Sequence, residues 1–190
     1  MARRHDPTIR AELTRKAVDY VVSHGVADFS LRPLANAIGA SARMLIYHFG
    51  SREGLMRAIL AGLREYGDAR ITAWLNGGAR TMPEFVRMYW AEVSARGAEK
   101  MGRLTFELYA LALRDPDSYP GVLTEPLAYW RGLAQRTGVL EARQDAEATL
   151  LLAATRGLLL DLCATGERAR IDAAAELLAQ LIERPRPDVA

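Results

Sequence analysis

The chain has 190 residues, of which 50% are hydrophobic, 25% charged and 7% aromatic. This composition is typical of a soluble globular protein and excludes a disordered or collagen-like chain. The formal net charge is +2, but residues 1 to 64 hold ten Lys and Arg against five Asp and Glu, whereas residues 65 to 190 hold fifteen against eighteen. A basic first segment favours contact with a polyanion, and chance clustering is the alternative.

Helix caps and glycines divide the first 76 residues into four predicted helices. The sequence has no run of alternating apolar and polar residues, so no strand is predicted. Side chains that can cap a helix start stand at four places: Asp6 (followed by Pro7), Ser30, Ser41 and Ser51. Gly25 ends the first helix and Gly39 the second, the third runs to about Phe49, and the fourth ends at Asn76. No apolar run of a secretory leader is present, so we expect a cytoplasmic protein.

Five more helices are predicted in the rest of the chain. Thr81 and Glu84 have the spacing of a capping box. Further stops are Asp115-Pro116, Thr137-Gly138 and Gly166. The expected helices lie near residues 82–96, 99–114, 118–136, 144–165 and 168–183, so the sequence predicts an all-α protein.

Residues 29 to 55 predict two short helices joined by a tight turn. Ala35 is small where the two helices would cross, and Gly39 can adopt the left-handed conformation that ends the first of them. Leu34, Ile38 and Leu45 can fill the corner. These features are typical of a helix-turn-helix.

Steps of about 100° per residue divide the second of these helices into two sides. The inward side holds Ala42, Leu45, Ile46 and Phe49, and the outward side holds Arg43, Met44 and Tyr47. Arginine can bind a guanine edge, methionine can contact a thymine methyl, and tyrosine can donate to a phosphate. The outward side therefore has the groups of a major-groove reader, with partial burial as the alternative for Met44 and Tyr47.

Groups that can bind phosphates flank this corner. Ser30 and Arg32 open the second predicted helix, and Ser51 and Arg52 open the fourth. Helix N-termini attract anions, and arginine strengthens that attraction. Three arginines near the N-terminus could add contacts or form an ordinary solvated end: Arg3, Arg4 and Arg10.

A longer pattern runs through the same region, A-x-x-x-G-x-S followed by L-x-Y-H-F-x-S-[KR]-E-x-L. It falls on Ala35, Gly39, Ser41, Leu45, Tyr47, His48, Phe49, Ser51, Arg52, Glu53 and Leu55. In this pattern the region from Thr8 to Leu60 resembles the DNA-binding head of TetR-type transcriptional regulators. The chain departs from the family at Met44, at Ile46, where the family usually has tyrosine, and at Arg52, where it has lysine. The resemblance implies that His48 contacts a phosphate or links the third and fourth helices.

The predicted DNA contacts combine the outward side, its flanks and the resemblance. They are Ser30, Arg32, Ser41, Arg43, Met44, Tyr47, His48, Ser51 and Arg52. We expect an N-terminal three-helix helix-turn-helix head over residues 1–52, a helical ligand-binding and dimerisation body over 53–184, and a frayed tail over 185–190.

Ten of the fourteen aromatic residues lie between Tyr66 and Trp130. Aromatic side chains commonly line cavities for apolar small molecules, and the resemblance implies an inducer pocket among the middle helices. The alternative is that these rings fill the core. The predicted ligand contacts are Trp90, Phe106, Tyr109, Phe85, Tyr89, Met101, Tyr129 and Trp130.

The last two predicted helices are more apolar than one small body can cover. We therefore predict a symmetric four-helix contact between two copies, which the resemblance also implies. The predicted interface residues are Leu150, Ala153, Ala154, Gly157, Leu177, Leu178 and Leu181. The single cysteine, Cys163, cannot form an internal disulfide and is expected to be a small buried residue. The most apolar stretch is interrupted by Arg156 and Asp161 and is too short for a bilayer, so we expect no membrane anchor.

Together these features predict a homodimeric, ligand-responsive transcriptional regulator, with a repressor favoured over an activator. It would bind near-palindromic double-stranded operator DNA and be released by a small apolar or aromatic effector. The alternative is a ligand-independent DNA-binding architectural protein or activator. We do not expect an enzyme, because no Cys-His pair, histidine cluster, phosphate loop or carboxylate pair stands out, and we expect no metal or cofactor.

Overall fold

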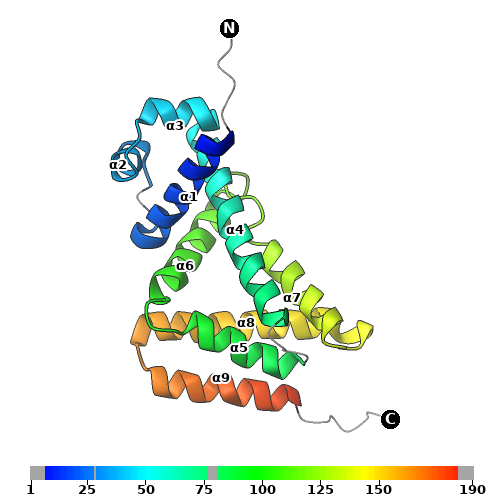
Figure 1. Ribbon diagram of the computed structural model, residues 1–190. Coiled ribbons are helices and arrows are strands. Elements are labelled where there is room, and N and C mark those ends of the chain that lie inside the picture. Colours follow the sequence, from blue (N-terminus) through cyan, green and yellow to red (C-terminus); the bar gives the residue numbers. More distant parts are fainter. Residues whose placement is uncertain (1–6, 28, 77–80, 184–190) are drawn as a thin grey trace. The chain divides into compact units, whose positions relative to one another are not determined.

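The computed structural model describes residues 7–27, 29–76 and 81–183, and within these ranges all regular structure is helical. The helices are α1 (Pro7–His24), α2 (Leu31–Ala37), α3 (Ala42–Phe49), α4 (Arg52–Asn76), α5 (Met82–Val93), α6 (Glu99–Arg114), α7 (Glu125–Arg136), α8 (Glu141–Thr165) and α9 (Arg168–Glu183) (Figure 1). The all-α prediction is therefore confirmed. The expected cap Asp6 and the tail 185–190 lie outside the described residues.

The helices form two compact units. Unit 1 consists of Met1–Arg70 and Arg103–Leu123, and unit 2 of Ile71–Gly102 and Thr124–Ala190. The division falls inside α4 and α6 rather than after residue 52, because part of α6 packs with the first helices. The functional division at residue 52 stays a prediction.

In unit 1, helices α1, α2 and α3 pack against one another around a small apolar core (Figure 1). Buried residues of α1 repeat every four positions, at Leu13, Ala17 and Val21, so this helix contributes a narrow stripe. Leu34 of α2 and Leu45 of α3 are both fully buried. Truncating a fully buried leucine costs about 2–5 kcal/mol, so these side chains fix how α2 and α3 meet.

A single carboxylate ties α6 to the turn after α1. Glu107 Oε2 accepts a hydrogen bond from the Val26 amide at 2.7 Å. Gly25, just before this amide, has φ +78°. A Cβ placed on Gly25 would lie 2.5 Å from Glu107 Oε2. The turn therefore needs glycine both for its backbone conformation and for the space that the carboxylate occupies.

Two glycine substitutions separate these requirements. Gly25→Ala is expected to destabilise the protein by roughly 1–3 kcal/mol more than Gly39→Ala, because Glu107 must swing away and lose its bond to Val26. Gly39 also has a positive φ, +70°, but a Cβ there meets nothing within 4 Å. Urea unfolding measures both costs. Equal losses of unfolding free energy for the two variants would contradict this explanation. It would also be contradicted if Gly25→Ala cost as much in the Glu107→Ala background as in the wild type.

Unit 2 is built on packing of α5 against α9, α7 against α8, and α8 against α9. Its core includes Phe85 and Val86 of α5, Trp130 of α7 and Leu151 of α8. Polar bonds also join α5 to α9. Trp90 Nε1 donates to Asp172 Oδ1 at 2.8 Å. Arg87 Nε donates to Glu176 Oε2, and Arg87 Nη2 donates to Glu176 Oε1, both at 3.0 Å.

The start of α5 confirms the predicted capping box. Glu84 N donates to Thr81 Oγ1 at 3.4 Å, and Thr81 N donates to Glu84 Oε2 at 3.0 Å. Three predicted helix bounds, in contrast, were wrong. Helix α5 ends at Val93 rather than at residue 96, α7 begins at Glu125 rather than at residue 118, and α8 begins at Glu141 rather than at residue 144. The residues before α7 form turns because Pro120 precedes Gly121, whose φ is +82°.

By length and composition alone, α8 could cross a membrane. The apolar stretch considered in the sequence lies inside this helix, which has 25 residues in all, and the absence of a membrane anchor stays a prediction. Core helices of soluble proteins pass the same test, so this is weak evidence for a membrane. Six residues of α8 are buried in the structure: Ala148, Leu151, Leu152, Thr155, Leu159 and Leu162.

Candidate nucleic-acid interface

The connection between α2 and α3 has the geometry of a helix-turn-helix corner. Gly39 adopts φ +70°, and the Ala40 amide donates to the Ala35 carbonyl at 2.8 Å. This pair of features ends α2 in the way glycine-terminated helices usually end. Ser41 then begins α3, and its hydroxyl accepts a hydrogen bond from the Met44 amide at 3.1 Å.

The two sides of α3 differ sharply in exposure. Leu45 and Phe49 are buried against unit 1, whereas Tyr47 is 48% exposed and Arg43 is also exposed. Both outward residues lie where the periodicity predicts. Met44, also predicted outward, is half-buried.

Ile46 was assigned to the inward side, and this was wrong, because 38% of its surface is exposed. The residue lies about 80° from the mean direction of Leu45 and Phe49 around the helix. Helices α1 and α2 cover a narrower arc of α3 than the helical periodicity alone predicts. Ile46 therefore joins Arg43 and Tyr47 in an exposed group, which we call the reading patch.

The guanidinium of Arg43 is available to a partner. Within the part of the chain that the structure describes, it makes no hydrogen bond or ion pair. Residues three and four positions apart on a helix are neighbours, so Arg43 stands beside both Ile46 and Tyr47. The reading patch thus places a cation, an aliphatic group and a phenol side by side on a helix narrow enough for the major groove.

Arg52, a predicted phosphate contact, is already bound to another part of unit 1. Its Nη2 donates to the Phe29 carbonyl at 3.0 Å, and its guanidinium lies 5.3 Å from the centre of the Phe29 ring. The residue therefore links the start of α4 to the segment before α2. Because a guanidinium carries five N–H donors, this link still leaves donors for a phosphate.

Lysine and alanine substitutions separate the charge of Arg52 from its bonds to Phe29. Arg52→Lys is expected to lower stability by about 1 kcal/mol while keeping the salt dependence of DNA binding. Arg52→Ala should lower stability similarly and also reduce the slope of log K against log salt by about one. Urea unfolding and titration of a random-sequence duplex at several salt concentrations measure these effects. An unchanged slope for Arg52→Ala would exclude the phosphate contact.

Two side chains occupy the free amides at the start of α4. Ser51 Oγ accepts a hydrogen bond from the Gly54 amide at 3.0 Å. The pKa of the Glu53 carboxyl is lowered by a hydrogen bond from the Glu53 backbone amide and, to a smaller extent, by one from the Ser51 hydroxyl. Glu53 is therefore charged at neutral pH and reduces the positive potential that a phosphate would meet here. Any phosphate contact at this end of α4 depends on Arg52 more than on the helix amides.

The other predicted contacts lie around α2 and α3. Ser30 and Arg32 are exposed at the start of α2, and the Ser30 side chain makes no capping hydrogen bond. His48 is half-buried, with its ring edge-on to Tyr47 at 5.1 Å between centroids. Arg10, an expected additional contact, lies with its guanidinium 5.4 Å from the centre of the Phe49 ring. Two further expected contacts, Arg3 and Arg4, lie outside the described residues.

The predicted ligand contacts divide between the two units. In unit 2, the Trp130 ring centroid lies within 6.2 Å of the rings of three other residues: Phe85, Tyr89 and Tyr129. Phe85 and Trp130 are fully buried, so they offer almost no surface to a ligand. Trp90 is also buried, and its indole is held by Asp172, which the sequence analysis did not single out.

Tyr89 belongs to this aromatic group, and its hydroxyl is shielded from water. Burial raises the pKa of the Tyr89 hydroxyl and lowers the pKa of Arg156 on α8, and each charge partly offsets the effect of burial on the other. Such a setting favours uncharged groups. The remaining predicted ligand contacts are half-buried along α6: Met101 in unit 2, and Phe106 and Tyr109 in unit 1.

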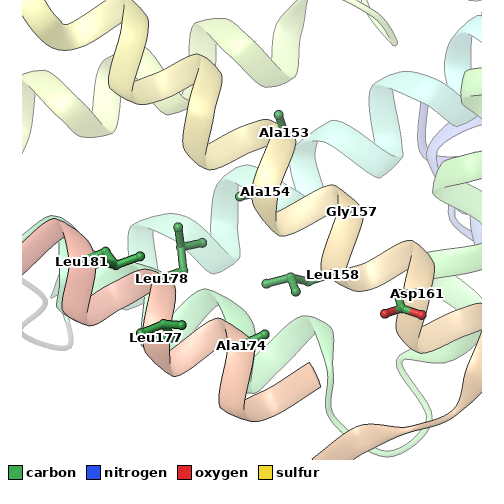
Figure 2. Close-up of a pocket in the computed structure, with 9 residues that line it drawn as sticks. All are labelled: Ala153, Ala154, Gly157, Leu158, Asp161, Ala174, Leu177, Leu178 and Leu181. Carbon is green, nitrogen blue, oxygen red and sulfur yellow. The ribbon is translucent and has the colours of Figure 1, made fainter. Parts of the chain in front are cut away.

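An apolar groove of about 460 Å³ runs between α8 and α9 in unit 2. Figure 2 shows it between small residues of α8, such as Ala153 and Gly157, and leucines of α9. Six of the seven predicted interface residues line it: Ala153, Ala154, Gly157, Leu177, Leu178 and Leu181. The seventh, Leu150, is exposed on α8. Asp161 also lines the groove, and its carboxylate binds Arg170 at 2.8 Å.

The corner and its exposed reading patch define a helix-turn-helix DNA-binding protein. Residues 13–59 match the family model described as "Bacterial regulatory proteins, tetR family". The HTH-type transcriptional regulatory protein RaaS of Mycobacterium tuberculosis is 42% identical over 53 residues, which cover 28% of this chain and 24% of that protein. The matched segment thus spans about a quarter of that relative's length.

Two solved structures are similar over nearly the whole chain. A crystal structure from Rhodococcus sp., assigned to the TetR-family transcriptional regulators, has a TM-score of 0.72 and 16% identity over 92% of this chain and 98% of that chain, which shows the fold alone. The multidrug binding protein EbrR, crystallised with imidazole, has a TM-score of 0.72 and 28% identity over 98% of this chain and 96% of that chain. Residues 13–59 are therefore similar to the TetR family of regulatory proteins, and the chain as a whole has the fold of these two solved structures. Among the described residues, no group of three or more His, Cys, Asp or Glu side chains could hold a metal ion.

Proposed function

We propose that this chain is a homodimeric, cytoplasmic transcriptional repressor that binds a near-palindromic operator and is released by a small apolar or aromatic effector. The single observation that carries the DNA-binding part is the reading patch. Arg43, Ile46 and Tyr47 are exposed on α3, while Leu45 and Phe49 anchor the helix from behind. A recognition helix held rigidly by its buried side can present its other side to base edges.

The groove between α8 and α9 supports the homodimer. Two of its leucines are about half exposed, Leu177 by 51% and Leu181 by 50%, although water contact of such side chains is unfavourable. Small residues opposite them would let a partner helix approach closely. A two-fold dimer would carry two heads and bind half-sites about 34–36 Å apart or a multiple of that spacing.

The effector part of the proposal is supported by the aromatic group around Trp130 and by EbrR, which is described as a multidrug binding protein. Tyr89 and Tyr129 are half-buried and could offer ring edges to a bound molecule. The effector would act by binding one of two conformations more tightly, which shifts the population away from the DNA-binding one.

Selection of duplexes from a randomised library by the full-length protein tests the proposal. We expect a near-palindromic consensus, and we expect some members of a panel of aromatic compounds, from imidazole to naphthalene derivatives, to change tryptophan fluorescence and release that duplex. A library that yields no consensus would contradict the proposed DNA recognition. A consensus that no compound releases would favour a ligand-independent architectural protein or activator.

That second function has an observation in its favour. Phe85 and Trp130 are fully buried and pack against each other, and the Trp90 indole is bound by Asp172. These three aromatic residues thus stabilise the core of unit 2, whether or not a ligand binds. Fluorescence and DNA release, measured on the same samples, distinguish the two functions.

A further inference from the structure

Ile46 is an exposed aliphatic residue at the centre of a helix that otherwise presents polar groups outward. Scattered exposed hydrophobic residues are common and need no explanation on their own. Ile46 differs in its neighbours, because it stands one turn from Arg43 and next to Tyr47. Its surface is 38% exposed, so part of the side chain is open to a partner.

The chemistry of the major groove limits what such a residue can bind there. Base edges in this groove are hydrogen-bond donors and acceptors, with one apolar group, the thymine C5 methyl. An isoleucine cannot donate to a phosphate, as the tyrosine usual at this position in the family could. Against DNA it can only pack on that methyl or lose water without gaining a contact.

Resting on the proposed function, we propose that Ile46 reads a thymine methyl and so fixes an A·T pair in each half-site. Its Cβ lies about 5–6 Å from that of Arg43, as for any residues three apart on a helix. Base pairs are spaced by about 3.4 Å along the duplex. The thymine therefore lies one or two base pairs from the guanine that Arg43 binds.

Met44 is the competing residue, because from the sequence it is the residue predicted to contact a thymine methyl. The structure favours Ile46. Met44 is half-buried and lies on the opposite flank of Tyr47, whereas Ile46 lies on the same flank as Arg43. Met44 also supplies the backbone amide that Ser41 caps, so its backbone is held at the start of the helix.

Thymine-to-deoxyuridine exchange removes only the C5 methyl and is a direct test. The full-length protein and its variants would be titrated with the selected duplex carrying deoxyuridine at each thymine in turn, at one fixed salt concentration. For the wild type we expect one thymine per half-site whose exchange weakens binding about fourfold, the effect of one buried methyl group. Ile46→Ala should bind the thymine and deoxyuridine duplexes equally, and Met44→Ala should keep the fourfold preference.

The outcomes separate this inference from the function beneath it. A consensus with no constant A·T pair within two base pairs of the guanine overturns the reading by Ile46 while leaving the operator in place. A thymine preference that persists in Ile46→Ala does the same. If the preference for thymine over deoxyuridine is lost in Met44→Ala and kept in Ile46→Ala, then Met44 is the residue that contacts the thymine methyl. A library without any consensus overturns the proposed function and this inference together. Circular dichroism and urea unfolding confirm that the exposed substitution leaves the fold intact.

Discussion

Replacing Arg43 with alanine is expected to weaken binding to the selected operator by roughly 5- to 150-fold, equivalent to about 1–3 kcal/mol, with little change on random DNA. The reason is that the guanidinium has no partner within the described chain, so a guanine edge can take both of its forked donors. Binding to the operator and to a scrambled duplex of equal length, measured by fluorescence anisotropy at one salt concentration, checks the prediction.

A matched control removes the same charge elsewhere. Arg136 is exposed in the last turn of α7, in unit 2, and Arg136→Ala should leave operator binding within about twofold of the wild type. Equal losses on operator and scrambled DNA for Arg43→Ala would show that this residue only attracts the phosphate backbone. The base-reading role of α3 would then have to be abandoned.

Gly157→Glu is expected to convert the protein from dimer to monomer. Gly157 lines the α8–α9 groove, and a Cβ placed there meets nothing within 4 Å, so the substitution fits the protomer itself. In an isologous interface both copies would carry the carboxylate, and an unpaired buried charge costs at least about 2 kcal/mol. Sedimentation velocity over a range of concentrations should therefore show at least ~30-fold weaker dimerisation.

Gly132→Glu is the control for this experiment. Gly132 lies inside α7, and a Cβ there also meets nothing within 4 Å, so both variants gain a side chain and a charge on an open helix position. We expect Gly132→Glu to sediment like the wild type. If Gly157→Glu still forms dimers as tightly as Gly132→Glu, the groove is not the interface between copies.

The bounds of the helices could be predicted where the sequence contains clear capping residues. Thr81 with Glu84 defined the start of α5, and Ser41 defined the start of α3. The start of α7 was missed because Tyr119 and Val122 look like part of a helix, while Pro120 and Gly121 force turns. The distribution of α4 and α6 between two units depends on packing between distant segments, which local patterns do not contain.

The exposed side of α3 was predictable in part. A step of about 100° per residue locates Arg43 and Tyr47 well, because they point nearly opposite to the buried leucine. It cannot say how wide an arc the neighbouring helices cover, which is why Ile46 was misplaced. Nor could any sequence pattern show that Arg52 is bound to the carbonyl of Phe29, since that bond depends on the path of the chain between α1 and α2.

The bond between Glu107 and the main chain at Val26 has an evolutionary consequence. Because the donor is a peptide N–H, every amino acid except proline can supply it, and position 26 is free to vary as far as this bond is concerned. Position 25 has less freedom, since its backbone angle disfavours a side chain and the nearby carboxylate would have to move to admit one. In homologous sequences, an acidic residue at position 107 should thus co-vary with glycine at position 25 rather than with the identity of residue 26.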